Sequence, residues 1–459
     1  MSKSDNAFAQ YLDLVRDNAA VMAKGRPALL EAVNKAGTAR LAEAIEAYKP
    51  ASGEIPECRL DRLFAPDYGV NIARVPMTAD VAASFRCGVP QLNSLLAVVA
   101  NDIFRPTDVL MRNMPEGLTV CSLRQVPTEF EADAAAMLAE YKDSGDIAGA
   151  IADALAHDGI YVRVAPHTEI EKAVQIVNIF NSPVPMLTPR RLLVHACEGS
   201  KVKILLCDHT QTPAVQHLNL QNVYIRVDAG AEVEFYDIEE SSAATHRLFS
   251  FRAVQHNDSR LTVNTDFLSG GVSRNEFDIT VPGDGAYTSL SGLAIISGKQ
   301  VCSDSVVLRH LGSHCTSRQI FKNALFDNGR GAFGGRIVVD EAARFTDAAQ
   351  TNRNILESPS ARMEASPQLE IYCDEVKCSH GATTGQLDER ALFYMQARGI
   401  PRDEAKRMLT QAFMVDVIDN ISFEVLRQRL HILVEKRLSG ASADCSTCAT
   451  ACHSQATEE

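Results

Sequence analysis

The chain has 459 residues, of which 46% are hydrophobic and 22% charged, and it carries a formal net charge of −13 at pH 7. This length allows two or three globular domains with a large core. The acidic balance argues against a general nucleic-acid binder and against binding to anionic membrane surfaces. The sequence contains no run of about 18 apolar residues, so no membrane-spanning helix is predicted.

The N-terminal residues lack the apolar segment and the cleavage site of a secretory signal. We therefore expect a cytoplasmic protein, in which the 12 cysteines stay mostly reduced. Most of them occur singly on apolar faces and are expected to be buried small hydrophobic residues, as at Cys87, Cys121, Cys197 and Cys302.

Residues 1–155 predict an N-terminal domain that is mostly helical. Apolar residues recur at helical spacing between Phe8 and Val15, and the stretch 26–50 repeats the pattern with many Ala, Leu and Glu residues. After a break marked by prolines, the signal is mixed. It contains a strand at 115–123 and two helices at 130–143 and 146–159.

Residues 156–385 show a different pattern, in which a small turn is followed by alternating apolar residues. Four copies start roughly 25–31 residues apart: EGSKVKILL (198–206), AGAEVEFYD (229–237), NDSRLTVNT (257–265) and PGDGAYTSL (282–290). Looser copies follow at 328–339 and 358–366. Repeated strand–turn units of this length favour a parallel β-helix, and an antiparallel sandwich with long hairpins is the alternative. The period is too loose for a hexapeptide-type left-handed helix.

Residues 386–438 predict three short amphipathic helices. Asp388 can cap the first, Gly399 ends it, and Pro401 opens the second. Such helices cannot form a large core alone, so they either cap the solenoid or offer a docking face to a partner. Residues 439–459 are small and polar, with several cysteines, and predict a disordered Cys-rich tail.

Cys378 and His380 lie where the strand pattern gives way to the helical one. In an extended chain two such residues point to the same face, roughly 6.5–7 Å apart. Thiolate and imidazole both suit iron or an iron–sulfur intermediate, and Lys377 or His380 could lower the pKa of the thiol. The alternative is a buried cysteine beside a surface histidine. The alternating residues expected to point inward fall on odd positions up to Cys373 and on even positions from Val376. A turn or bulge is therefore expected near Asp374.

Two other groups carry potential ligands. In the tail, the spacing C-x2-C-x3-C-H could bind one metal ion or part of an iron–sulfur cluster, although no hydrophobic framework would preorganise it and an unstructured thiol tail is favoured; its residues are Cys445, Cys448, Cys452 and His453. The pair His310 and His314, with Cys315, would ligate a metal only on a helix. Its context is strand and loop, so a structural role is expected.

The segment DEVKCSHGATTGQLDE, followed by ALFYMQARGIP, closely resembles the signature of the SufD branch of the SufB/SufD family, which belongs to the SufBCD iron–sulfur cluster assembly system. FGGRIVV and TDAAQTNRN resemble the conserved coils of the same family, and the likeness covers about 220 residues well. Arg344 stands where the family often has Lys, and Asn323 where Gly is common. The stretch ESPSARMEASPQ lacks the cysteine of SufB-like members, which favours the SufD branch over a SufB-like subunit.

The resemblance implies a mainly β protein with flanking helices, built on a right-handed parallel β-helix core. It implies a non-enzymatic scaffold that pairs with a SufB-like subunit through the β-helix and docks a SufC-like ATPase through helices 386–438. The chain itself has no G-x4-G-K-[ST] motif. The expected docking residues are Leu392, Phe393, Tyr394, Arg398, Met408 and Phe413.

By the same resemblance, His380, and with less support Cys378, handles transient iron or a nascent cluster shared with SufB. A homodimer of the isolated subunit is left open, and no residue pattern supports a bound flavin. The competing classes are a β-helix enzyme, such as a polysaccharide lyase or an acyltransferase, and a stable iron–sulfur or zinc protein that uses the tail. A lyase would show clustered acidic calcium ligands with a basic catalytic residue, and the sequence shows neither.

Overall fold

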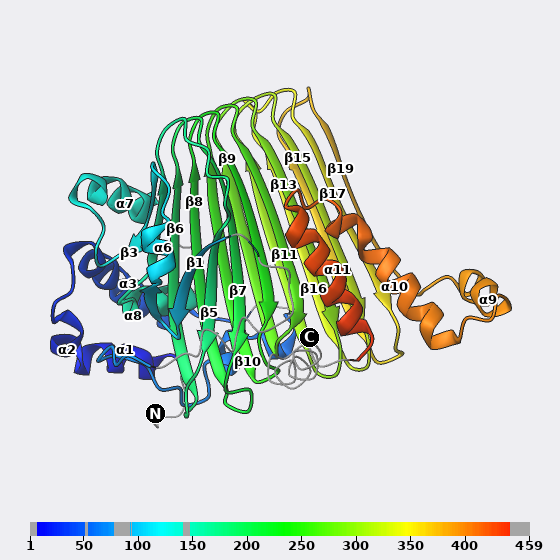
Figure 1. Cartoon of the computed structure of the whole chain (residues 1–459), viewed down its shortest axis with the longest axis horizontal. Helices are drawn as coiled ribbons and strands as arrows, with labels where there is room; N and C mark the ends of the chain where they lie inside the picture. The colour runs from blue at the N-terminus through cyan, green and yellow to red at the C-terminus, as the bar shows by residue number, and fades with distance from the viewer. Residues whose placement is uncertain (1–6, 51–53, 78–91, 93, 141–146, 441–459) are drawn as a thin grey trace, which may run out of the picture.

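The computed structural model describes residues 7–50, 54–77, 92, 94–140 and 147–440. Its centre is a stack of β-strands with helices at both flanks (Figure 1). The strands are β1 (Leu95–Ala100), β2 (Ile103–Pro106), β3 (Leu118–Ser122), β4 (Ile160–Val164), β5 (Val174–Phe180), β6 (Met186–Ala196), β7 (Lys201–Thr210), β8 (His217–Val227), β9 (Glu232–Glu240), β10 (Thr245–Gln255), β11 (Arg260–Ser269), β12 (Val272–Val281), β13 (Tyr287–Ile296), β14 (Val301–His310), β15 (Thr316–Leu325), β16 (Arg330–Val339), β17 (Asp347–Leu356), β18 (Arg362–Ile371) and β19 (Lys377–Gly385).

The strands form two sheets. Sheet 1 has the order β19-β17-β15-β13-β11-β9-β7-β5-β1-β2, and sheet 2 has the order β18-β16-β14-β12-β10-β8-β6-β4-β3. The chain alternates between the sheets from β4 to β19, and neighbours within each sheet run parallel. This is a right-handed parallel β-solenoid, which confirms the predicted fold class.

The length of each rung agrees with the sequence repeat. In sheet 1, Lys201 pairs with Glu232, Glu232 with Arg260 and Arg260 with Tyr287, so the rungs there take 31, 28 and 27 residues. The four clear copies of the repeat are the starts of β7, β9, β11 and β13. The two looser copies fall on β16 and β18 of sheet 2, which explains why they do not align with the others.

One corner of the solenoid is built from residues in the left-handed region, one to a rung. The N–H of Gly199 donates to Ala229, that of Gly230 to Asn257, and that of Gly285 to Ser313, so each turn is hydrogen-bonded to the next. Gly230 and Gly285 have φ of 65° and 68°, a backbone conformation that glycine adopts without steric cost. The small residues of the sequence repeat are therefore corner residues.

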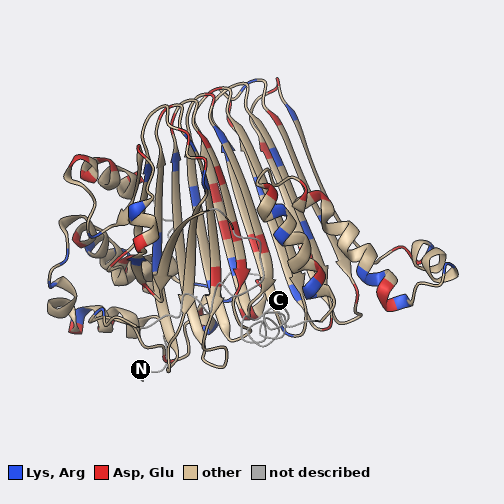
Figure 2. Cartoon of the chain, viewed as in Figure 1, with Lys and Arg blue, Asp and Glu red and all other residues tan. Residues whose placement is uncertain are grey.

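The interior of the solenoid is mostly apolar, because alternate strand residues point inward; Val233, Phe235, Leu261 and Val263 are all fully buried. The middle rungs also enclose charge. Arg247 on β10 forms ion pairs with Asp237 and Glu239 on β9, and Asp208 on β7 lies 3.6 Å from it. Acidic residues gather on these strands of sheet 1 (Figure 2).

Helices cover the outer faces of both sheets. The N-terminal helices are α1 (Ala9–Asp17), α2 (Ala19–Ala23), α3 (Ala28–Ala47), α4 (Leu60–Leu63), α6 (Asp108–Arg112), α7 (Thr128–Glu140) and α8 (Ile147–Leu155), with the 3-10 turn η1 (Pro56–Cys58). Side chains of α1 and α8 join Leu218, Leu220 and Leu248 of sheet 2 in one apolar cluster, in which α8 contacts β6 and β8 directly. β1 and β2 extend sheet 1, and β3 extends sheet 2.

The C-terminal helices are α9 (Glu389–Ala397), α10 (Arg402–Ile418) and α11 (Glu424–Leu438). α10 and α11 lie on the outer face of sheet 1, where Met414, Val417 and Leu430 join one apolar cluster with Tyr236 and Leu293. α9 projects beyond the solenoid (Figure 1). Within the described ranges, no helix combines the length and the apolar character needed to cross a membrane.

Candidate functional site

The solenoid ends in an open rung made of β18 and β19. Each is the outermost strand of its sheet and pairs with one neighbour only, β18 with β16 and β19 with β17. Most residues of β19 are exposed. Along β17, by contrast, buried residues alternate with partly exposed ones over most of the strand. The free edges and the inward-facing side chains of this rung therefore lie open to solvent.

The connection between β18 and β19 lies where the alternation of inward-pointing residues shifts from odd to even positions. β18 ends at Ile371, the chain bends at Asp374 and Glu375, and β19 begins at Lys377. The expected turn near Asp374 is confirmed. Cys373 and Val376 both pack on the small apolar cluster at this end, although they belong to opposite sides of the bend.

His380 occupies an inward-facing position of the last rung. It pairs with Gln350 on β17, which pairs with Gln319 on β15. Gln319 and Gln350 are buried and joined by a 2.6 Å hydrogen bond. His380 continues this interior column but is exposed, because no further rung covers it among the described residues. Its imidazole is thus held by a rigid strand at the mouth of the solenoid.

Cys378 lies one inward position before His380 and pairs with Ala348. It packs beside Ile337, Val339 and Ala343. Burial raises the pKa of the Cys378 thiol, although a hydrogen bond from the Ala348 backbone lowers it in part. The pKa of Cys378 is thus raised, contrary to the expectation that Lys377 or His380 lowers it, because partial burial disfavours the thiolate, and the thiol is protonated at neutral pH.

The predicted docking residues divide into buried and exposed groups. Leu392 is buried in α9, and Phe413 of α10 packs on the sheet 1 cluster. Phe393, Tyr394 and Met408 are exposed, with 73%, 60% and 45% of their surface accessible. The Arg398 guanidinium lies 5.2 Å from the centre of the Tyr394 ring. An exposed apolar patch of this kind on a projecting helix is typical of an interaction surface.

The other ligand candidates from the sequence are structural or lie outside the described residues. His310 is buried, with Nε2 3.0 Å from the Ser317 hydroxyl, and the Cys315 thiol donates to the Gly283 carbonyl. His314 occupies an exposed left-handed turn. The His310 and Cys315 side chains thus contact neighbouring strands and turns, as a structural role would require. Four candidates lie outside the described residues: Cys445, Cys448, Cys452 and His453. Cys87, which was expected to be a buried apolar residue, also lies outside them.

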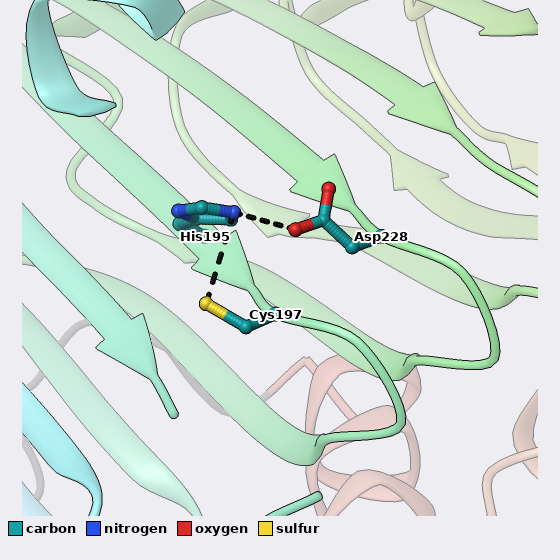
Figure 3. Close-up of side chains that lie close together, drawn as sticks. All are labelled: His195, Cys197 and Asp228. Carbon is teal, nitrogen blue, oxygen red and sulfur yellow. Dashed lines mark hydrogen bonds and ion pairs between the residues drawn. The ribbon is translucent and has the colours of Figure 1, made fainter. Parts of the chain in front are cut away.

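One group of side chains was missed in the sequence. His195, Cys197 and Asp228 meet on the outer face of sheet 2 (Figure 3). Burial lowers the pKa of His195, but hydrogen bonds with Asp228 and Cys197 outweigh it and raise the pKa to about 9. Burial raises the pKa of Asp228, yet His195 and Arg226 bring it down to about 2. The pair is therefore an imidazolium and a carboxylate at neutral pH. The signal available was H-x-C, the reverse of the C-x-H spacing at 378–380.

Comparison with known proteins gives two matching family models. Residues 179–413 match the model described as "SUF system FeS cluster assembly, SufBD core domain", and residues 5–176 match "SufBD protein N-terminal region". The first model covers the solenoid from the last two residues of β5 to β19, together with α9 and most of α10.

Curated relatives agree. An iron–sulfur cluster assembly SufBD family protein of Synechocystis sp. is 26% identical over 388 residues, covering 82% of this chain and 84% of the relative. The iron–sulfur cluster assembly protein SufD of Escherichia coli is 31% identical over 227 residues, 50% of this chain and 54% of that protein. SufD of Bacillus subtilis is 24% identical over 286 residues, 62% of this chain and 65% of that protein. The chain thus spans between half and two thirds of the two SufD proteins.

Proposed function

Because the chain belongs to the SufB/SufD family and takes part in iron–sulfur cluster assembly, we propose that it is a SufD-like scaffold subunit of a SufBCD complex. The stretch 357–368, which includes most of β18, lacks the cysteine expected of a SufB-like member, and this supports the SufD branch. We propose a non-enzymatic role in the cytoplasm. The eight described cysteines are all unpaired, which supports a reducing compartment.

The open rung is the proposed contact with a SufB-like subunit. Its two strand edges are unpaired, and its inward-facing residues would be interior if another rung followed. A second solenoid placed end to end would cover both features. The single observation that carries the proposal is that His380 is inward-facing in register but exposed in this chain.

In this arrangement iron, or a nascent cluster, is the cargo rather than a resident cofactor. His380 would supply an imidazole nitrogen at the subunit junction, opposite soft ligands of the partner. Cys378 would support the rung as a protonated thiol, since its pKa is raised by burial. No step through a flavin is proposed.

The C-terminal helices are the proposed docking site for a SufC-like ATPase. The exposed side chains Phe393, Tyr394 and Met408 support this, as does the projection of α9 away from the solenoid (Figure 1). ATP-driven motion of the docked partner would reach the open rung through α10, which is fixed to β15 by Lys322.

The test is the substitution His380→Ala in the co-expressed complex. We expect the three subunits still to co-purify, because the exposed imidazole contributes little to packing, and the cluster yield to fall by about tenfold. His314→Asn is the matched control, since that histidine is also exposed and Asn tolerates its left-handed backbone. A cluster yield unchanged by His380→Ala, measured by absorbance and acid-labile sulfide, would contradict the proposed role.

A further inference from the structure

The group formed by His195, Cys197 and Asp228 lies far from the open rung. His195 is the penultimate residue of β6 and Cys197 follows that strand, so both point to the outer face of sheet 2. Asp228 occupies the corner of the next rung, where its N–H donates to the Ala196 carbonyl. β6 lies six strand positions from β18, or about 29 Å at the usual spacing of ~4.8 Å.

Two ligand atoms, a carboxylate oxygen and a thiol sulfur, approach the same imidazole nitrogen. His195 Nε2 lies 2.8 Å from Asp228 Oδ2 and 3.8 Å from Cys197 Sγ (Figure 3). In a catalytic Cys–His–Asp triad the carboxylate holds the opposite ring nitrogen from the thiol. Here thiol and carboxylate face the same nitrogen, which can donate only one proton. That arrangement suits a shared cation better than proton transfer.

We propose that His195 Nε2, Cys197 Sγ and an Asp228 carboxylate oxygen bind a divalent cation of the Zn²⁺ and Fe²⁺ class. Imidazole, thiolate and carboxylate are ligands that these borderline ions share. Binding replaces the proton between His195 and Asp228 and releases the thiol proton of Cys197 to solvent. No oxidant or reductant is required.

The distances fit such an ion with small adjustments. Ideal bonds in a tetrahedral zinc site separate nitrogen from sulfur by about 3.6 Å and nitrogen from oxygen by about 3.3 Å. The nitrogen–sulfur distance already matches, and Asp228 must withdraw by about 0.5 Å. His195 and Cys197 are buried, whereas 22% of the Asp228 side chain is exposed, so water can reach a fourth position from that side.

A second observation concerns the other ring nitrogen. His195 Nδ1 is buried and has no hydrogen-bond partner among the described residues, although Asp133 Oδ2 of α7 lies 3.9 Å away. A metal on Nε2 would keep the ring proton on Nδ1, facing this carboxylate. Carboxylates placed in this way orient the ligating histidine in many metal sites. A carboxylate that could orient the ring is therefore already present beside His195 Nδ1.

The surrounding charges are nearly balanced. Arg226 donates to the second oxygen of Asp228 at 2.9 Å and lies near Glu140, and Arg163 lies 3.8 Å from Asp133. Arg226 therefore fixes the carboxylate and leaves its other oxygen for the cation. Because the ligands come from two successive rungs, the ion would link the corner after β6 to the corner after β8.

The test uses the full chain with Cys445, Cys448 and Cys452 replaced by serine, so that the tail thiols cannot contribute. Co²⁺ is the spectroscopic probe, with Zn²⁺ as competitor and Fe²⁺ titrated separately without oxygen. We expect one equivalent of Co²⁺ with a thiolate charge-transfer band and the strong visible bands of four-coordinate cobalt. Which of Zn²⁺ and Fe²⁺ binds more tightly identifies the preferred ion.

Variants separate this site from adventitious binding. Cys197→Ser should abolish the charge-transfer band, and Asp228→Asn and Asp133→Asn should each weaken binding at least about tenfold. Cys207→Ala, a buried cysteine under the C-terminal helices, should leave binding unchanged. Unfolding in chelator shows whether each variant is folded. Absence of Co²⁺ binding, or binding that survives both Cys197→Ser and Asp228→Asn, overturns the proposal, and the test does not depend on cluster assembly.

Discussion

His310 shows how a single buried side chain makes the stability of the solenoid depend on pH. Burial lowers the pKa of His310 from 6.5 to about 4. Between these values the unfolded chain binds a proton at this site and the folded chain does not. The free energy of unfolding should therefore fall as the pH drops from about 6.5 towards about 4, by up to ~1.4 kcal/mol per pH unit from this residue.

His310→Gln removes that proton-binding site and leaves an amide that can still face Ser317. We expect the variant to have a shallower dependence of unfolding free energy on pH in this window, as measured by urea unfolding. His314→Asn, at an exposed histidine, should show the same dependence of unfolding free energy on pH as the parent. Parallel curves for His310→Gln and the parent would show that His310 does not carry the effect.

The sequence identified residues by type and spacing but not by environment. The C-x-H pair at 378–380 was recognised as a possible ligand pair. The H-x-C pair at 195–197 was not, because Cys197 was expected to be a buried small apolar residue. Its partner Asp228 lies 31 positions further along the chain, and only the rung register brings the two together. The pKa of Cys378 was misjudged for a related reason: the adjacent Lys377 is visible in the sequence, but the burial that dominates is not.

At the scale of elements, α10 is held on sheet 1 by a buried lysine. Lys322 on β15 is 2% exposed, and its Nζ donates to the Phe413 carbonyl at 2.7 Å and to Asp416 at 2.5 Å. Lys322→Met keeps the shape of the side chain but removes its hydrogen bonds to both acceptors. We expect a local loss of about 1.5–3 kcal/mol, seen as faster amide hydrogen exchange in α10.

α11 should be less affected, because Arg437 holds it independently through the Leu268 carbonyl and the Ser297 hydroxyl. Arg407→Met, which removes an exposed pair with Glu404 on the same helix, is the matched control and should cost less than about 1 kcal/mol. Equal exchange rates in α10 for Lys322→Met and the parent would mean that apolar packing alone holds this helix.

The strands could be predicted because a small turn followed by alternating apolar residues repeats at a nearly constant interval. The copies at 198–206, 229–237 and 257–265 lie in one sheet and in register. The sequence could not say which face the C-terminal helices cover, since their apolar stripes fit either the solenoid or a partner. In the structure the apolar residues divide along the chain: Met414 and Val417 face sheet 1, while Phe393 is exposed.

At the scale of the whole molecule, the two ends of the solenoid differ in how their strands pair. β2 and β3 pair antiparallel with their neighbours near the N-terminal helices, whereas β18 and β19 leave two parallel edges free. Pro367 lies within β18, a position tolerated because an edge strand needs fewer donors. The sequence predicted a solenoid but not its open end, because exposure there depends on the absence of a following rung.

Ala382 offers a direct test of that open end. It is an inward-facing residue of β19, paired with the fully buried Asn352, yet it is itself exposed. Ala382→Glu should leave the stability of the isolated chain almost unchanged, since the carboxylate stays in water. If a partner solenoid covers this rung, the same carboxylate becomes buried without a counter-charge. Affinity for the SufB-like subunit should then fall at least about tenfold, or ~1.4 kcal/mol.

Thr383→Glu places the same charge one residue further along, on the opposite face of the strand, in register with the exposed Arg353. It should bind the partner as the parent does, in titrations followed by light scattering or calorimetry. The contrast between neighbouring positions depends on strand alternation alone, so net charge cannot explain it. If both variants bind like the parent, the partner contacts another surface, and the exposure of His380 then has no link to assembly.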